Sequence, residues 1–532
     1  MLSILLALAT SARAVVADPS QSPPPPVPAQ LAFGPPQRAH SSPGALVSFT
    51  WQDRAAFQRA TQLFDDDDLD VWFAGRRSTV GARDPHWEAV VRFDDDLAQD
   101  DSVSRLVARV EPDAAQGLPP SALADHLSSP SGSTSYARAL SAAVLANLSA
   151  APLETLSTGA IHDTYHPYDG IRDILASLEE AHPEWVKVVS LGKSSQGRDI
   201  WAVKVTNQTA PAHEGSTVAG QDDDEESEDE DGDEDVSDGP LPFVVSSSSS
   251  KRHRHKRGRK LGFVIAGTQH AREWIAASTL IYLVHDLVAP NDKGKTTHHK
   301  LLNSVEFTFV PVVNPDGYVY SWDTDRLWRK SRQPVGSPSS PSSSSSSSSD
   351  KPPKACFGID LNRNWGYEFQ RGARPNPCSD SYPGREPFES VELQALRDYL
   401  VDARNGVDAF FDVHSFGQML LFPYSFSCNV KTADEENHYE AVLQAAKALR
   451  GVHGRQFETG SVCEISLTSP GMSLDWTYAS AKIRWSFGAE LRDGGIFGFL
   501  LPPSQIRPSG EEMSAALRSL TQFILDKEAG KR

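Results

Sequence analysis

Hydrophobic residues in the later part of the chain change their spacing from one segment to the next. Residues 171–182 place apolar side chains at helical spacing, whereas residues 186–191 and 200–205 are short apolar runs typical of strands. The apolar runs at 261–266 and 410–413 predict two further strands. Because strands that alternate with helices pack as a sheet covered by helices, this pattern predicts an α/β domain with a mostly parallel sheet.

The N-terminal part, residues 45–152, mixes shorter runs of both kinds. Strands are expected at 45–51, 71–73 and 89–93, and helices at 55–64 and 102–110. A chain of 532 residues is too long for one ordinary domain. We therefore expect a second, smaller α/β domain in this part, and a separate partner-binding domain is the alternative.

The first residues have the character of a targeting segment. Residues 1–17 are apolar with small residues at Ala12, Ala14 and Ala17, which predicts a signal peptide, although a basic start is absent. Residues 18–44 form a proline-rich linker, and no later run is long and apolar enough to span a membrane. We expect a secreted, extracellular protein, with a vacuolar location as the alternative. The Asn147 and Asn207 sequons are potential glycosylation sites.

Two segments of biased composition interrupt the larger domain, near 210–258 and near 334–353. The first contains an acidic run at 222–238 followed by a basic tract at 251–257, and the second is rich in serine. Blocks of like charge and serine-rich tracts predict disordered insertions. The net charge of −19 owes much to the acidic run, which also competes with polyanions for the basic tract, so no nucleic-acid partner is expected.

The strand at 261–266 is followed at once by His270 and Glu273, three residues apart. Residues at this spacing can face one side of a helical turn, and zinc accepts both imidazole nitrogen and carboxylate oxygen. Alone, this pair is weak evidence, because most short matches of this kind are a surface histidine near a surface acid. His414, at the end of the strand 410–413, offers a third ligand, and three protein ligands are typical of a catalytic zinc site.

Further motifs follow in a fixed order along the chain, at 326–330, 360–365 and 489–493. Together with 268–274 and 410–415 they resemble the zinc metallocarboxypeptidase family typified by pancreatic carboxypeptidases A and B. The resemblance implies a zinc carboxypeptidase domain over 160–527 with a mixed central sheet and helices on both faces. It also implies a pro-domain at 45–152 that covers the active-site cleft, and one Zn²⁺ per chain.

The resemblance implies a role for each residue of the predicted site. His270, Glu273 and His414 would bind zinc, and Glu490 would act as general base and then general acid. Arg329 would stabilise the oxyanion, while Asn362 and Arg363 would hold the terminal carboxylate, which a planar guanidinium matches with two hydrogen bonds. Further substrate contacts are expected from Arg272, Ser415, Phe416 and Leu474. The expected partners are C-termini of peptides or proteins, bound by a monomer.

Substrate preference is expected to depend on Leu474, at the family position at the base of the pocket for the terminal side chain. An apolar residue there favours apolar or aromatic C-termini, whereas an acid would select lysine or arginine. Asp475 is its neighbour, so a register error of one residue would reverse this prediction.

The chain departs from the family pattern at Leu467, where a tyrosine usually closes over the terminal carboxylate. A hydrogen bond lost from a charged group costs about 1.5 to 3 kcal/mol, or one to two powers of ten in affinity. Phe416 also lacks the hydroxyl that often follows the third ligand. Fungal cell-wall-associated relatives that lack the catalytic glutamate are regarded as inactive, but Glu490 is retained here.

Two functions therefore remain after the sequence is considered. The first is a secreted zinc carboxypeptidase that hydrolyses the last peptide bond of its substrates. The alternative is a catalytically inactive zinc protein that binds C-terminal peptides and acts in cell wall organisation. A zinc endopeptidase or deacylase is disfavoured, because Asn362 and Arg363 would have no terminal carboxylate to bind.

Four cysteines in an exported chain predict two disulfides, and three pairings are possible. Zinc binding by cysteine is disfavoured because no Cys-x-x-Cys spacing occurs. The family resemblance implies the pairs Cys356–Cys378 and Cys428–Cys463.

Overall fold

In the computed structural model, the described residues are 45–51, most of 54–61, 70–77, 86–93, 160–209, 259–289, 297–335, 356–369 and 376–530. The predicted signal peptide, the proline-rich linker, the helix at 102–110 and almost all of the two insertions lie outside these residues. Among the described helices, none combines the length and the apolar character that a bilayer-spanning helix requires.

The larger domain is built on an eight-stranded sheet with the order β10-β9-β11-β8-β6-β7-β5-β4. Its strands are β4 (Val186–Lys193), β5 (Asp199–Val205), β6 (Leu261–Gly267), β7 (Val305–Val310), β8 (Val407–His414), β9 (Met419–Phe422), β10 (Glu458–Ser461) and β11 (Trp485–Glu490). The central strands β11, β8, β6 and β7 are parallel, whereas β5 is antiparallel to both β7 and β4, and β9 is antiparallel to β11. The mixed sheet is as expected.

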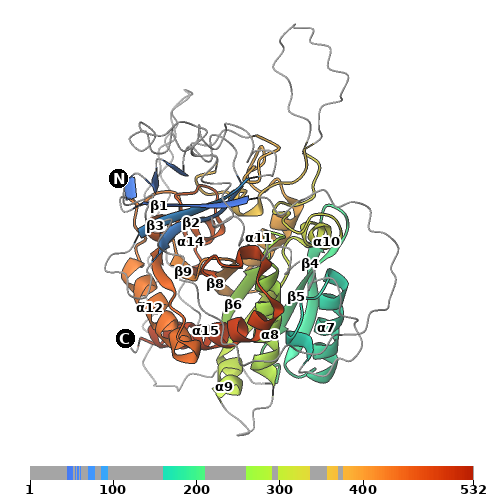
Figure 1. The fold of residues 1–532 in the computed structure, drawn as a ribbon. Coiled ribbons are helices and arrows are strands. Elements are labelled where there is room, and N and C mark those ends of the chain that lie inside the picture. Colours follow the sequence, from blue (N-terminus) through green and yellow to red (C-terminus); the bar gives the residue numbers. More distant parts are fainter. Residues whose placement is uncertain are drawn as a thin grey trace, which may run out of the picture.

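Helices cover both faces of this sheet (Figure 1). Alternate residues of a strand point to opposite faces, and every residue of β6 is buried, so this strand contributes to two cores. Phe263 and Ile265 pack with α7 (Tyr168–Ala181), α8 (Trp274–Val288), α12 (Glu435–His453) and α15 (Ile506–Glu528). Val264 and Ala266 pack with α11 (Val391–Val401) and α14 (Ser473–Ala479). The predicted α/β fold with helices on both faces is confirmed.

Shorter helical segments connect these elements. They are α9 (Thr297–Ser304), α10 (Pro315–Asp323) and α13 (Val462–Ile465), with the 3-10 turns η2 (Ala160–His162), η3 (Leu361–Arg363), η4 (Gly498–Leu500) and η5 (Pro503–Gln505). The predicted helix at 171–182 and strands at 186–191 and 200–205 correspond to α7, β4 and β5, with ends that differ by a few residues.

A second, antiparallel sheet precedes this domain in the chain. It consists of β1 (Ala45–Trp51), β2 (Asp70–Arg77) and β3 (His86–Phe93) in the order β1-β3-β2. In Figure 1 these strands, drawn in blue, lie beside β9 and α14. The strand β2 approaches β9 so closely that a Cβ added to Gly75 would lie 2.6 Å from Met419 Cε. Ser466 Oγ also donates to the carbonyl of Ala74 at 3.2 Å.

Two disulfides connect segments of the larger domain. The first links Cys356 and Cys378, which lie on either side of η3 in the chain, with Cα atoms 5.0 Å apart. The second links Cys428 and Cys463, with Cα atoms 5.4 Å apart. These are the expected pairs, and the described residues include no free cysteine.

Candidate functional site

Three neighbouring parallel strands end at the same edge of the sheet, and each brings a predicted site residue there. His414 is the last residue of β8, and Glu490, the last residue of β11, is its register partner. Gly267, at the end of β6, pairs with Val413, so the turn that follows β6 and carries His270 starts beside the same position. Ligand sites of open α/β sheets form at these carboxyl ends. The parallel pairing of β6, β8 and β11 therefore gathers residues that lie far apart in the sequence.

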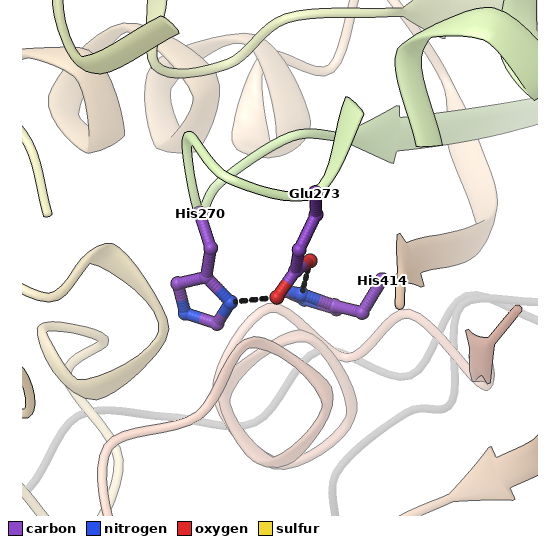
Figure 2. A group of neighbouring side chains, drawn as sticks. All are labelled: His270, Glu273 and His414. Atoms are coloured by element: carbon purple, nitrogen blue, oxygen red, sulfur yellow. Dashed lines mark hydrogen bonds and ion pairs between the residues drawn. The ribbon is translucent and has the colours of Figure 1, made fainter. Parts of the chain in front are cut away.

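His270, Glu273 and His414 lie together, buried, at this edge (Figure 2). Glu273 Oε1 is 2.7 Å from His270 Nδ1, and Glu273 Oε2 is 2.9 Å from His414 Nδ1. One ligand atom from each residue lies within 4.8 Å of the others. In the described part of the chain this is the one group of its kind.

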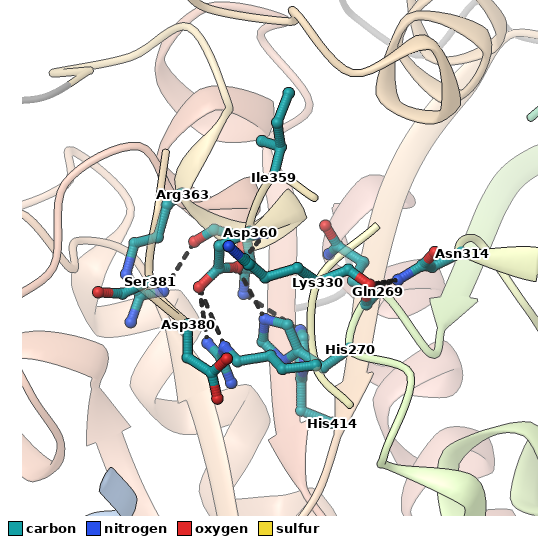
Figure 3. Close-up of polar contacts among 12 residues, drawn as sticks. Gln269, His270, Asn314, Lys330, Ile359, Asp360, Arg363, Asp380, Ser381 and His414 are labelled. Atoms are coloured by element: carbon teal, nitrogen blue, oxygen red, sulfur yellow. Dashed lines mark hydrogen bonds and ion pairs between the residues drawn. The ribbon is translucent and has the colours of Figure 1, made fainter. Parts of the chain in front are cut away.

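The outer nitrogens of both imidazoles contact carboxylates, and Figure 3 shows the one on His270, from Asp360. His270 Nε2 is 3.1 Å from Asp360 Oδ1, and His414 Nε2 is 3.0 Å from Asp412 Oδ2. A carboxylate on the far nitrogen fixes the tautomer and orientation of a metal-binding imidazole. Each Nδ1 thus faces the shared space beside Glu273, and two imidazole nitrogens with one carboxylate oxygen form a donor set suited to zinc. The residues fit the ion that the sequence predicts.

Sequence reasoning missed Asp360 and Asp412 as site residues. Asp412 precedes His414 by two residues on β8, and residues at this spacing share one face of a strand. Asp360 immediately precedes η3, and its carboxylate accepts the backbone N–H of Asn362 at 3.0 Å. The i, i+2 spacing could have identified Asp412, but nothing in the local sequence indicates that Asp360 reaches His270.

Electrostatic interactions separate the roles of the two glutamates in the site. Burial alone would raise the pKa of Glu273, but His270 and His414 hold that pKa below its usual range. Burial raises the pKa of Glu490 to about 8, and the negative charge of Glu273 acts in the same direction while His414 opposes it. A cation beside a carboxyl group lowers its pKa. Glu273 is therefore ionised, as a zinc ligand would have to be, whereas Glu490 suits the exchange of a proton near neutral pH.

Arg329 and Arg363 approach the same space from a neighbouring loop and turn. Asp360 Oδ2 accepts two hydrogen bonds from Arg329, from Nε at 3.1 Å and from Nη2 at 3.0 Å. Arg363 Nη1 donates to the carbonyl of Asn362 at 2.8 Å. The side chain of Asn362 is buried. Its Nδ2 lies 3.1 Å from His414 Nε2, and its Oδ1 accepts the N–H of Ser473 at 2.9 Å. Arg363 is also less buried than Asn362.

A cavity of about 150 Å³ joins these groups. Its polar wall consists of His270, Arg272, Glu273, Arg329, Asn362, Arg363, Ser379, Asp380, Ser381, His414, Ser415, Ser466, Ser469 and Glu490. Its apolar wall consists of Val71, Phe73, Ala74, Phe416, Met419, Val462, Leu467, Met472 and Phe499. Phe73 of β2 stacks on Phe416 with ring centroids 6.1 Å apart, so the N-terminal sheet forms part of the wall.

Three further predicted substrate contacts, Arg272, Ser415 and Phe416, also line this cavity. Arg272 is buried, with Nη1 3.4 Å from Asp380 Oδ2 and its guanidinium 4.3 Å from the centre of the Phe499 ring. The N–H of Ser415 points to Glu273 Oε2 at 3.3 Å. Phe416 packs edge-on against Phe499 with ring centroids 5.0 Å apart.

Leu474 is not among the residues that line this cavity. It is buried in the core between α14 and the sheet, where one of its methyl groups is 3.1 Å from the position that a Cβ on Gly488 would take. Its position in the first turn of α14 directs the side chain toward the sheet, and Met472, just before the helix, lines the cavity instead. The role predicted for Leu474 in substrate preference stays a prediction.

Comparison with known proteins agrees with this geometry. The profile of the zinc carboxypeptidase family (Peptidase_M14) matches residues 171–516. The inactive metallocarboxypeptidase ecm14 of Talaromyces stipitatus is 33% identical over 387 residues, which cover 69% of this chain and 55% of that protein. The protein named inactive metallocarboxypeptidase ECM14 in Paracoccidioides lutzii is 36% identical over 282 residues, 49% of this chain and 45% of that one. The chain thus spans about half the length of the curated relatives it matches.

Solved structures show the same architecture. Bovine thrombin-activatable fibrinolysis inhibitor, solved in complex with tick carboxypeptidase inhibitor, is 27% identical with a TM-score of 0.52, over 69% of this chain and 99% of that chain. Carboxypeptidase A from Helicoverpa armigera, 21% identical with a TM-score of 0.58 over 90% of this chain and 97% of that chain, supports the fold alone. With a family profile that covers more than half of its length, the chain belongs to the zinc carboxypeptidase family.

Proposed function

We propose that the protein is a zinc-dependent carboxypeptidase that removes single residues from the C-termini of peptides. One observation carries this proposal: Glu490 lines the same cavity as His270, Glu273 and His414, at the ends of adjacent strands. A carboxyl group that can exchange a proton next to a zinc-ligand set is what hydrolysis requires. A protein that only binds zinc has no need of it.

His270, Glu273 and His414 would hold the ion. Zinc in such a site lowers the pKa of bound water and polarises a carbonyl group. Arg363, which lines the cavity, would bind the terminal carboxylate of the substrate and so place the last peptide bond beside Glu490. Glu490 would accept a proton from the attacking water at a carboxylate oxygen and deliver it to the leaving amine.

Arg329 supports the same reaction from the other side of the cavity. Two hydrogen bonds to Asp360 fix the guanidinium, which therefore needs no reorganisation when negative charge develops on the scissile carbonyl oxygen. Burial alone would lower the pKa of Arg329, but Asp360 and Glu273 raise it, so the group stays charged.

Digestion of blocked peptides tests the proposal. The zinc-loaded chain, before and after limited trypsin treatment, would be incubated with a peptide, and release of the terminal amino acid would be followed by mass spectrometry. We expect release that stops on chelation of zinc and in the Glu490→Gln variant. No release by any preparation with full zinc content would refute the proposal.

A catalytically inactive protein that holds C-terminal peptides, with a role in cell wall organisation, is the second candidate. Leu467 offers no hydroxyl to the terminal carboxylate, and the curated relatives above carry the word inactive in their names. Zinc-dependent binding of a peptide, measured by calorimetry and unaccompanied by turnover in any preparation, would favour this candidate.

The proposal includes export as a zymogen and action as a monomer outside the cell or in the vacuole. Phe73 on β2 occupies the cavity wall, and Arg54, also before the family domain, donates to the carbonyl of Cys463 at 2.6 Å. These contacts support an N-terminal domain that restricts access to the site. Proteolysis between this domain and α7 should then raise activity, and an unchanged rate after complete cleavage would contradict the zymogen proposal.

A further inference from the structure

Met472 lines the same cavity as Arg363, whose carbonyl oxygen its neighbour Gly471 packs against. Met419, Val462 and Leu467 also belong to the apolar wall of this cavity. Leu474, the expected base of a pocket, lies behind this wall with 2% of its surface exposed. A terminal residue held by Arg363 therefore meets Met472 before it can reach Leu474.

The backbone on both sides of Met472 is anchored. Gly471 has a φ of 69° and packs so closely on Arg363 that a Cβ on it would lie 2.3 Å from the Arg363 carbonyl oxygen. Its own carbonyl accepts the N–H of Trp365 at 3.0 Å. On the other side, the N–H of Ser473 donates to Asn362 Oδ1 at 2.9 Å. The backbone of Met472 is thus held beside Arg363, which would bind the terminal carboxylate.

The lining of the cavity agrees with a short apolar pocket beside Arg363. The volume of about 150 Å³ is bounded in part by Val71, Phe73 and Ala74 of the N-terminal sheet, so the side chains of the family domain define the pocket better than this volume does. Met472 belongs to its apolar wall, whose described residues carry no charge. A methionine at this position leaves room for a small, uncharged side chain.

We infer that Met472 limits the terminal residue of the substrate to small uncharged side chains such as alanine, and excludes aromatic ones. The inference rests on the proposed function only in assigning the cavity to a peptide C-terminus. It replaces the preference for aromatic C-termini that Leu474 suggested. Met472 is a specificity-determining residue that touches the terminal side chain and takes no part in proton transfer.

The test compares two blocked peptides that differ only in a terminal alanine or phenylalanine. With the zinc-loaded, trypsin-treated chain, kcat/KM for the alanine peptide should exceed kcat/KM for the phenylalanine peptide by about tenfold or more. Even one methylene group in excess of what a pocket accepts lowers kcat/KM by about this factor, and phenylalanine adds a whole ring. Met472→Gly, and Met472→Ala if the first variant folds poorly, should shift this ratio toward phenylalanine by a similar factor. Thr468→Gly is the matched control, because it adds a glycine to the same loop at an exposed position.

Dissociation constants of the same peptides on the Glu490→Gln variant, with and without Met472→Gly, separate the two proposals. If the Glu490→Gln variant binds the alanine peptide selectively but the native chain hydrolyses neither peptide, the carboxypeptidase proposal is refuted and the role of Met472 in peptide selection is retained. A native preference for phenylalanine, or equal ratios in the native chain and Met472→Gly, would overturn the inference. Failure of both peptides to bind would overturn it as well.

Discussion

Asp360 holds together two parts of the site, and its replacement by asparagine tests the arrangement most directly. One oxygen of this fully buried carboxylate faces His270 Nε2 at 3.1 Å, and the other accepts two hydrogen bonds from Arg329 at 3.0 and 3.1 Å. Asparagine keeps the size of the side chain but removes the charge and one acceptor oxygen. Its amide cannot satisfy the imidazole N–H and the guanidinium together.

The expected magnitudes follow from these contacts. Loss of the carboxylate behind a metal-binding histidine lowers metal affinity about 10- to 100-fold, or about 1.4 to 2.7 kcal/mol. The Arg329 side chain is 13% exposed, so its charge would stay largely buried after losing the charge of Asp360, and breaking a buried ion pair costs about 3 kcal/mol at the low end. Asp360→Asn should therefore weaken zinc binding and destabilise the fold together.

Competition between the protein and a coloured zinc chelator measures the affinity, and urea unfolding measures the stability. Asp380→Asn is the matched control, because Asp380 lines the same cavity, is 40% exposed and lies beside Arg272. The control should bind zinc as the native chain does. Zinc affinity of Asp360→Asn within about twofold of both would refute the orienting role of Asp360.

His414→Ala should abolish stoichiometric zinc, since two ligands remain, and full metal content in elemental analysis would show that His414 is not a ligand. Glu490→Gln should keep zinc but lower kcat at least about a hundredfold; an unchanged kcat excludes Glu490 as the base. Leu467→Tyr should lower KM about 10- to 100-fold with a smaller change in kcat, because a hydroxyl at this cavity wall would bind the carboxylate in substrate and transition state alike; a rise in kcat alone contradicts this. Burial lowers the pKa of His438 to about 4, so the folded state keeps this imidazole neutral while the unfolded chain protonates it near pH 6.5. The free energy of unfolding is therefore unaffected by His438 above that pH and decreases by about 2 to 3 kcal/mol between pH 6.5 and pH 4.5 because of it. Urea unfolding of His438→Phe should show a smaller decrease of the free energy of unfolding over this range than the native chain, and equal decreases would contradict the role given to His438.

The local pattern of hydrophobic and polar residues was sufficient to predict the strands and helices that carry the site. The run of apolar residues before His270 predicts β6 because a strand buried on both faces needs a continuous hydrophobic sequence. The helix predicted over 171–182 corresponds to α7, because apolar residues at helical spacing form one buried face whatever the rest of the fold is. The three zinc ligands could also be proposed from sequence, because residue type and short spacing limit what each can do, and the order of the motifs supplied the rest.

Contacts between distant segments were decided only by the tertiary structure. The sequence does not reveal that Asp360 and His270, 90 residues apart, face each other, because strand order in the sheet brings their loops together. Leu474 lies in the first turn of α14 and points into the core, whereas Met472, two residues earlier, lines the cavity. The sequence alone does not show which of the two side chains faces the cavity. The contact of Phe73 with Phe416 likewise depends on how the N-terminal sheet packs on β9. Residue types and local periodicity fix the available chemistry, whereas the packing of whole elements determines which side chains share the cavity.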